Sequence, residues 1–101
     1  MKKRPAGESG PRPYHGYFYR MLTGQGPAAE GGALNYLEKG KLSLGFALLA
    51  YPASYENSGV MTFVVNQQGV VFQKDFGPNT LKAQTSITSF NPGEGWTRAV
   101  P

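Results

Sequence analysis

The chain lacks cysteine altogether and has one histidine, one tryptophan and one aspartate among its 101 residues. Without cysteine it forms no disulfide, no thiolate metal site and no thiol nucleophile. One histidine and six scattered carboxylates do not supply the spaced ligands of a zinc or calcium site. The uncharged run from Leu42 to Tyr55 contains Gly45 and Pro52 and is too short to span a bilayer as a helix. The sequence therefore predicts no metal, no cofactor and no membrane span.

Positive charge is concentrated at the N-terminus. The net charge is +4, but the first twelve residues hold four of the ten Lys and Arg residues and one of the six acids, which leaves +1 for the rest. Met1 to Arg4 resembles the start of a signal peptide, yet no apolar segment follows it. We expect residues 1–13, rich in Pro, Gly and charge, to be a disordered basic arm or linker. Charge confined to such an arm argues against nucleic-acid binding by the folded body.

Residues 14–101 are predicted to form a single sheet-rich domain, because this length suits one domain and the sequence is 40% hydrophobic and 13% aromatic. Tyr17 to Thr23 is β-prone and apolar on both faces until Arg20, which predicts a strand of the kind found at the centre of a sheet. Phe46 to Tyr51 predicts a buried strand that stops at Pro52.

The clearest local signal is a predicted hairpin. Two β-branched runs, Val60 to Val65 and Val70 to Asp75, flank the sequence Asn-Gln-Gln-Gly at residues 66–69, which predicts an antiparallel pair of strands. The stretch from residue 28 to residue 45 allows two interpretations. Residues 33–38 have the composition of a short helix, but we prefer a hairpin in which residues 34–38 pair with Lys41 onward across a Lys39-Gly40 turn.

The C-terminal part predicts a helix and a tail. Ala83, Ile87 and Phe90 recur at helical spacing, and Asn91-Pro92 would end that helix. The remaining residues form a tail that we expect to dock through Trp96. Together these elements predict an α+β fold that is mainly antiparallel β, with a four- to five-stranded meander sheet and one short C-terminal helix.

One motif resembles a phosphate-binding loop. Residues 24–29 fit the pattern G-x-G-x-x-A and follow a predicted strand. Gly31 and Gly32, however, break the helix that this pattern requires, and no acid lies near Leu44 to bind a ribose. We interpret the motif as a turn that ends a strand.

No catalytic constellation is recognisable. Neither Ser54 nor Ser58 lies in a nucleophile elbow. The only histidine, His15, would need the only aspartate, Asp75, to orient it, and no pattern brings the two together. We therefore expect the protein not to be an enzyme.

The aromatic residues are the candidates for a partner surface. They would form an exposed stacking platform, or else line the core while the tyrosines keep their hydroxyls in water, and we prefer the second interpretation. The candidate partner surface consists of Tyr14, His15, Tyr17, Tyr19, Tyr51, Tyr55 and Trp96.

Several strings of residues resemble the C-terminal part of a bacterial family known as domain of unknown function 2950. These strings are Pro13–Thr23, Gln25–Ala29, Gly45–Ala53, Asn57–Phe63, Asn66–Val71 and Lys74–Pro78. The resemblance covers about residues 13–90. It implies an exported protein of Gram-negative bacteria whose family has no assigned catalytic residues. Members carry a signal peptide and an additional N-terminal region, so the resemblance also implies a truncated relative or an excised domain.

The segment from Ala50 to Asp75 is similar, more loosely, to the C-terminal sheet of type IV pilin-like and pseudopilin proteins. Those proteins assemble through a long apolar N-terminal helix, for which this sequence has no candidate. The similarity therefore supports a sheet topology more than a filament.

These observations predict a non-catalytic binding or structural module of the cell envelope, periplasmic or secreted, that recognises a protein or glycan through its aromatic edge. A first alternative is a subunit of a pilus-like or other surface assembly, built by self-association through an exposed strand such as residues 17–23. A second alternative is a weak nucleic-acid binder that uses the basic arm.

Overall fold

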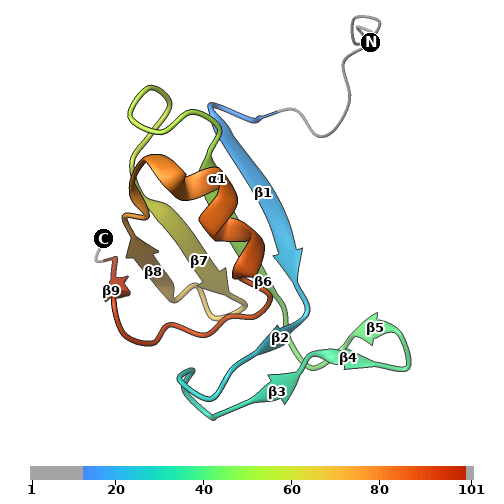
Figure 1. Cartoon of the computed structure of the whole chain (residues 1–101). Coiled ribbons are helices and arrows are strands. Elements are labelled where there is room, and N and C mark those ends of the chain that lie inside the picture. The colour runs from blue at the N-terminus through green and yellow to red at the C-terminus, as the bar shows by residue number, and fades with distance from the viewer. Residues whose placement is uncertain (1–12, 100–101) are drawn as a thin grey trace, which may run out of the picture.

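A five-stranded antiparallel sheet dominates the computed structural model, which describes residues 13–99 (Figure 1). The predictions for residues 1–12, including the basic arm, lie outside the described residues. The strands of the sheet, in spatial order, are β1 (Tyr17–Leu22), β6 (Ala47–Pro52), β7 (Thr62–Asn66), β8 (Val71–Lys74) and β9 (Thr97–Arg98). Every neighbouring pair is antiparallel. The predicted α+β fold with a mainly antiparallel sheet is confirmed.

Among the strands that the structure describes, the strand at residues 17–22 lies at one edge of the sheet and has β6 as its only neighbouring strand, so the prediction of a central position was wrong. Its apolar character on both faces has another cause. Phe18 and Leu22 lie on the face that the helical segment, residues 77–86, covers. Tyr19 and Met21 lie on the opposite face, which is apolar but is not covered by this segment. Apolar residues on both faces of a strand therefore indicate two apolar surfaces. They do not indicate whether the strand pairs with one neighbouring strand or with two.

The hairpin of β7 and β8 forms as predicted, with its loop stabilised by local hydrogen bonds. The N–H of Asn66 donates to the carbonyl of Val70 at 3.2 Å, which closes a three-residue loop. The Asn66 side-chain oxygen accepts from the N–H groups of Gln68 and Val70. Gly69 takes φ +76°, the left-handed conformation that such a loop needs at its last position.

Two small ladders interrupt the meander between β1 and β6. They consist of β2 (Gly24–Gln25) paired with β3 (Leu34–Asn35), and β4 (Leu37–Glu38) paired with β5 (Lys41–Leu42). The predicted hairpin is correct only near its turn, because Leu34 and Asn35 pair with β2 instead. Tyr36 separates the two ladders. Its side chain is completely buried, and its N–H donates to the carbonyl of Thr23 at 2.9 Å.

The helical segment runs as η1 (Gly77–Asn79), α1 (Thr80–Ala83) and η2 (Gln84–Ser86). The helix predicted from Ala83 to Phe90 was therefore wrong in its bounds, because Ile87 is extended. The guanidinium of Arg20 explains the early end: its Nη2 donates to the carbonyls of Gln84 and Ile87, each at 2.9 Å. Phe90 still reaches the core, from an extended segment whose backbone pairs with Gly24 and Gly26.

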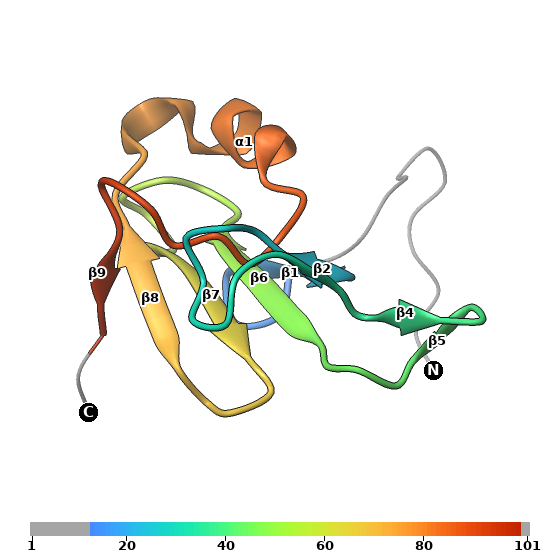
Figure 2. The ribbon, with the colours of Figure 1, turned by 90° about the horizontal axis from the view of Figure 1, so that it is seen from below.

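The helical segment and the chain that follows it cover one face of the sheet (Figure 2). The core forms on this side. Its buried members are Leu22, Ala29, Tyr36, Ala47, Leu49, Val64 and Phe90, and Tyr51, Phe72, Ile87 and Trp96 pack against them. The predicted docking of the tail through Trp96 is thus confirmed, and the tail also adds β9 to the sheet. Within residues 13–99, no helix is long and apolar enough to cross a membrane.

Candidate functional site

The structure brings four of the seven candidate residues together at the start of β1: Tyr14, His15, Tyr17 and Tyr19. The rings of Tyr14 and His15 meet edge to face, with 4.3 Å between their centroids, and the ring of Tyr14 lies 6.4 Å from that of Tyr19. Tyr14 is 67% exposed and Tyr19 is 49% exposed. This group is a solvent-facing aromatic cluster on one edge of the sheet.

A tight turn produces this cluster. The N–H of Tyr14 donates to the carbonyl of Tyr17 at 2.7 Å, and the N–H of Tyr17 donates back to the carbonyl of Tyr14 at 3.1 Å. His15 and Gly16 both have positive φ, at +52° and +83°, as the two central residues of a type I′ turn do. The turn folds Tyr14 along the outer side of β1 and occupies the backbone groups of Tyr17 there.

Tyr17 is held in place more firmly than its neighbours. Its hydroxyl donates to the carbonyl of Met61 at 2.9 Å, and its ring lies 6.1 Å from that of Phe63. Burial raises the pKa of Tyr17 above 10.0, and the adjacent Tyr19 phenol raises it further. A Cβ at Gly59 would overlap the Tyr17 hydroxyl, so the loop before β7 fits around this side chain only with glycine there. The role of Tyr17 is to join this loop to β1.

The other three candidate residues, Tyr51, Tyr55 and Trp96, lie outside this cluster and make different contacts. Tyr51 faces the helical segment and packs against the core. The hydroxyl of Tyr55 donates to Asp75 Oδ1 at 2.7 Å; this hydrogen bond, with smaller contributions from desolvation and nearby negative charge, raises the pKa of Tyr55 to about 12. Trp96 packs edge to face against Phe76 at 5.8 Å. The seven residues therefore do not form one surface.

The free edge of β1 is defined by the alternation of its hydrogen bonds. Pro52, which has no N–H, lies opposite Tyr17, and the residue after Pro52 donates to the carbonyl of Gly16 at 2.8 Å. The N–H and carbonyl of Tyr17 therefore point away from β6. In an antiparallel pair, every second residue of a strand has its backbone groups turned to the same side. The N–H and carbonyl groups of Tyr19 and Met21 therefore also point outward. The Tyr14 turn occupies the outward backbone groups of Tyr17 but not those of Tyr19 and Met21. Tyr19 and Met21 therefore form what we call the free edge.

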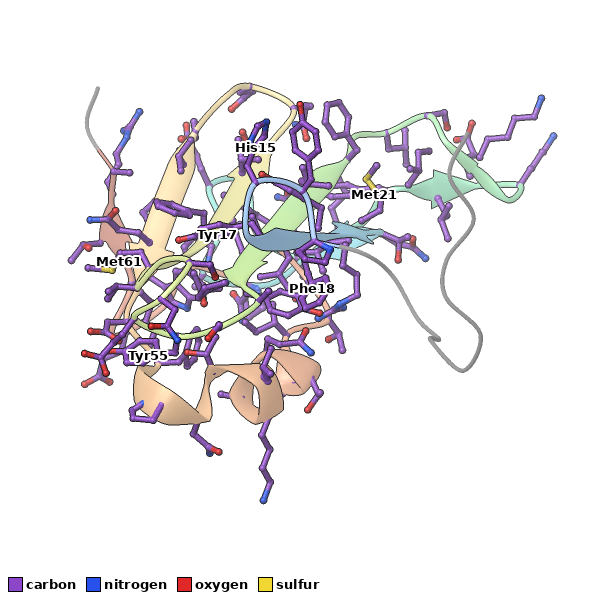
Figure 3. All side chains as sticks on the ribbon, turned by 90° about the horizontal axis from the view of Figure 1, so that it is seen from above. His15, Tyr17, Phe18, Met21, Tyr55 and Met61 are labelled. Atoms are coloured by element: carbon purple, nitrogen blue, oxygen red, sulfur yellow. The ribbon has the colours of Figure 1, made fainter. Side chains whose placement is uncertain are left out.

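The uncovered face of the sheet continues from this edge and is mostly apolar. In Figure 3, Met21 lies on the side away from the helical segment and Phe18 on the side toward it. The strand register places two rows of side chains on this face, which we call the open face: Tyr19, Ala50, Phe63 and Gln73 in one row, and Met21, Leu48, Val65 and Val71 in the other. Neither row contains a charged residue. The free edge and the open face together form one continuous surface.

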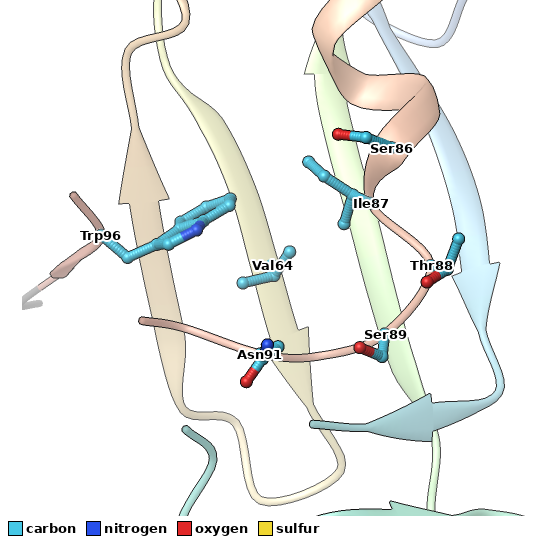
Figure 4. A pocket seen from close by; sticks show the side chains of 7 residues that line it. All are labelled: Val64, Ser86, Ile87, Thr88, Ser89, Asn91 and Trp96. Carbon is cyan, nitrogen blue, oxygen red and sulfur yellow. The ribbon is translucent and has the colours of Figure 1, made fainter. Parts of the chain in front are cut away.

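A pocket of about 210 Å³ lies on the opposite, covered side of the sheet (Figure 4). It opens between the end of the helical segment, the C-terminal segment and the sheet. We call it the Trp96 pocket, and its lining residues are Val64, Ser86, Ile87, Thr88, Ser89, Asn91 and Trp96. Trp96 and Ile87 stand on opposite sides, and Val64 lies between them. The lining is rich in hydroxyl groups and has no charged residue.

Sequence reasoning found Trp96 but missed the polar residues around it. The helix predicted over residues 83–90 would have distributed Ser86, Thr88 and Ser89 around a helical surface. Because the helical segment ends at Ser86 and Ile87 is extended, all three of these residues instead line the pocket. The available signal was a run of small polar residues shortly before the only tryptophan.

Metal chemistry has no candidate site in the part of the chain that the structure describes. Among residues 13–99, no group of three or more His, Asp or Glu side chains is placed to hold a metal ion. Asp75 accepts hydrogen bonds from the hydroxyl of Tyr55 and from the N–H of Gly77. The free edge with the open face presents backbone groups and aromatic rings, and the Trp96 pocket presents hydroxyls and an indole.

Comparison with known proteins gives a family. No curated protein and no solved structure matches the chain, so the pilin-like similarity of residues 50–75 stays a prediction. The model of a family described as protein of unknown function (DUF2950) matches residues 1–99. This range contains both the aromatic cluster and the Trp96 pocket, and it covers nearly the whole sequence. The chain belongs to the DUF2950 family.

Proposed function

We propose that this protein is a non-catalytic docking module of the bacterial cell envelope that binds an extended segment of a partner protein along β1. The observation that supports this function is the free edge itself: Tyr19 and Met21 present outward N–H and carbonyl groups beside the open face. The envelope location follows from the exported character that the family resemblance implies. Within residues 13–99, no group of three or more His, Asp or Glu side chains is placed together.

Strand addition explains how such a surface would bind. A partner strand paired with Tyr19 and Met21 would form four main-chain hydrogen bonds, each contributing about 0.5–1.5 kcal/mol. Its alternate side chains would extend the two rows of the open face, because side chains in a strand alternate between faces. The Tyr14 turn would stop the partner at one end, which limits the register.

The charge of Arg20 favours a different protein over a second copy of this chain. In the antiparallel register that uses Tyr19 and Met21 of both copies, Arg20 of one copy would lie directly opposite Arg20 of the other. Like charges at directly opposed positions destabilise a sheet. A partner strand with Asp or Glu at that position would instead place a carboxylate near this half-buried guanidinium. The occupant that fits is therefore an extended segment with apolar residues on one face and an acid on the other.

The test uses the peptide Thr-Val-Glu-Val-Thr, acetylated and amidated, with both valines on the open-face side. We expect it to bind with a Kd on the order of 0.1–1 mM and to shift the amide signals of Tyr19 and Met21 in a heteronuclear NMR titration. The same peptide with Lys in place of Glu should bind more weakly, because it would meet Arg20.

Proline variants separate edge binding from folding. Met21→Pro removes an outward N–H, which an edge strand tolerates, and should weaken peptide binding roughly tenfold. Arg98→Pro is the matched control on the opposite edge: the N–H of Ala99 donates to Val71, so the backbone groups of Arg98 point outward too. Unchanged peptide binding by the Met21→Pro variant, with its fold intact by circular dichroism, would refute the proposal. A dimer that only this variant loses would show that a second copy is the true occupant.

A further inference from the structure

We propose that the Trp96 pocket binds one neutral sugar ring of pyranose size. This inference is independent of docking at β1, because the pocket lies on the covered side of the sheet and the free edge borders the open face. Its volume of about 210 Å³ is below the range of about 300–1,000 Å³ in which drug-sized ligands bind. A single ring is therefore the size of ligand that it accepts.

The apolar part of the pocket suits the C–H face of a sugar. The indole of Trp96 projects over the sheet from one side, Ile87 stands on the other side, and Val64 forms the floor between them (Figure 4). Trp96 is held by the ring of Phe76, which meets it edge to face at 5.8 Å. Aromatic side chains offer a rigid apolar surface at low entropic cost, and the C–H bonds on one face of a pyranose are the apolar surface that matches it.

The polar part of the pocket suits sugar hydroxyls, which both donate and accept hydrogen bonds. Thr88 and Ser89 each bring a hydroxyl to the lining of the pocket, and each hydroxyl can donate to and accept from a ligand. Ser86 already donates to the carbonyl of Ala83 at 2.9 Å and retains its acceptor capacity. Asn91 accepts from the N–H of Ala28 through Oδ1 at 2.8 Å, which leaves its Nδ2 to donate. With no charged residue in the lining, the pocket selects a neutral ligand.

The single tryptophan makes the pocket directly observable, because all tryptophan fluorescence comes from the proposed site. The probes are glucose, galactose and N-acetylglucosamine, each titrated separately into the full chain. We expect at least one of them to change the emission of Trp96 saturably, with a Kd on the order of 1–10 mM, as a small ligand with a few hydrogen bonds gives.

Two pocket variants and one control test the geometry. Ser89→Ala removes a hydroxyl from the lining, and Asn91→Asp keeps the acceptor for Ala28 while replacing the free donor. Each should weaken sugar binding about 3- to 10-fold. Ser43→Ala changes an exposed serine after β5, outside the pocket, and should leave the Kd unchanged.

The sugar titrations have results that would overturn the proposal. No saturable change with any of the three sugars would overturn it, as would equal affinities in Ser89→Ala, Asn91→Asp and the parent chain. If the Met21→Pro variant still binds sugar, the sugar site is separate from the β1 edge. If the Met21→Pro variant loses sugar binding and the two pocket variants keep it, the sugar binds at the β1 edge and the proposal is wrong.

Discussion

Replacing Thr62 by valine should stabilise this protein. Thr62 lies in β7, its side chain is completely buried, and its Oγ1 has no hydrogen-bond partner among the described residues. Valine has nearly the same shape and the same branching at Cβ, so it preserves the packing and the preference for a strand. The substitution therefore removes a buried hydroxyl whose contact with water is lost on folding and not replaced.

The magnitude follows from the cost of burying a polar group. A buried hydroxyl without a partner costs about 1–3 kcal/mol in proteins. We expect Thr62→Val to raise the free energy of unfolding by about 1–2 kcal/mol. In a domain of this size, each 1 kcal/mol shifts the Tm by about 4–8 °C.

Thr80 provides a matched control in which the sign should reverse. It is also buried, with 1% of its surface exposed, but its Oγ1 donates to the carbonyl of Gly77 at 2.6 Å. Thr80→Val loses this hydrogen bond at the start of α1 and should lower the free energy of unfolding by about 1 kcal/mol.

Urea denaturation of the three proteins, followed by circular dichroism, gives the comparison. The midpoint should move upward for Thr62→Val and downward for Thr80→Val, with the slope m unchanged, since neither substitution alters the surface exposed on unfolding. Destabilisation by both substitutions would refute the reasoning, because it would show that the hydroxyl of Thr62 makes a favourable interaction in the folded protein.

Two further predictions concern the loops around the sheet. In an absorbance titration of the six tyrosines, Tyr55 should ionise with a pKa of about 12, and Asp75→Asn should lower this pKa; identical titrations of the two proteins would contradict the hydrogen bond. Because this pKa is raised above the unfolded value of 10.0, the stabilisation is fully present below pH 10 and is lost as the pH rises through about 12. Gly59→Ala should lower the free energy of unfolding by about 2–3 kcal/mol, because its Cβ would overlap the hydroxyl of Tyr17. Gly40→Ala, which has open space around its Cβ but a φ of +79°, should cost only about 1 kcal/mol, and equal losses in thermal denaturation would contradict the steric argument.

Elements whose signals are local could be predicted from the amino-acid sequence. The β7–β8 hairpin was predictable because Asn66 and Gly69 supply the hydrogen bonds and the positive φ of the loop from within the loop itself. The family was also readable from the sequence, since long strings of residues carry that resemblance. The aromatic cluster was also partly predictable, because Tyr14 and Tyr19 are close in sequence and only a two-residue turn separates Tyr14 from β1.

Which surfaces are exposed depends on the packing of the whole fold and could not be predicted from local patterns. An apolar pattern says that residues avoid water, but it does not say what covers them, so β1 looked central although it is an edge strand. The helical segment ends at Ser86 because Arg20, more than sixty residues earlier, binds the carbonyls of Gln84 and Ile87. That same early end brings residues 86–89 to the lining of the Trp96 pocket. The order of the strands and the contacts of Arg20, which no local propensity encodes, thus determined where the free edge and the Trp96 pocket lie.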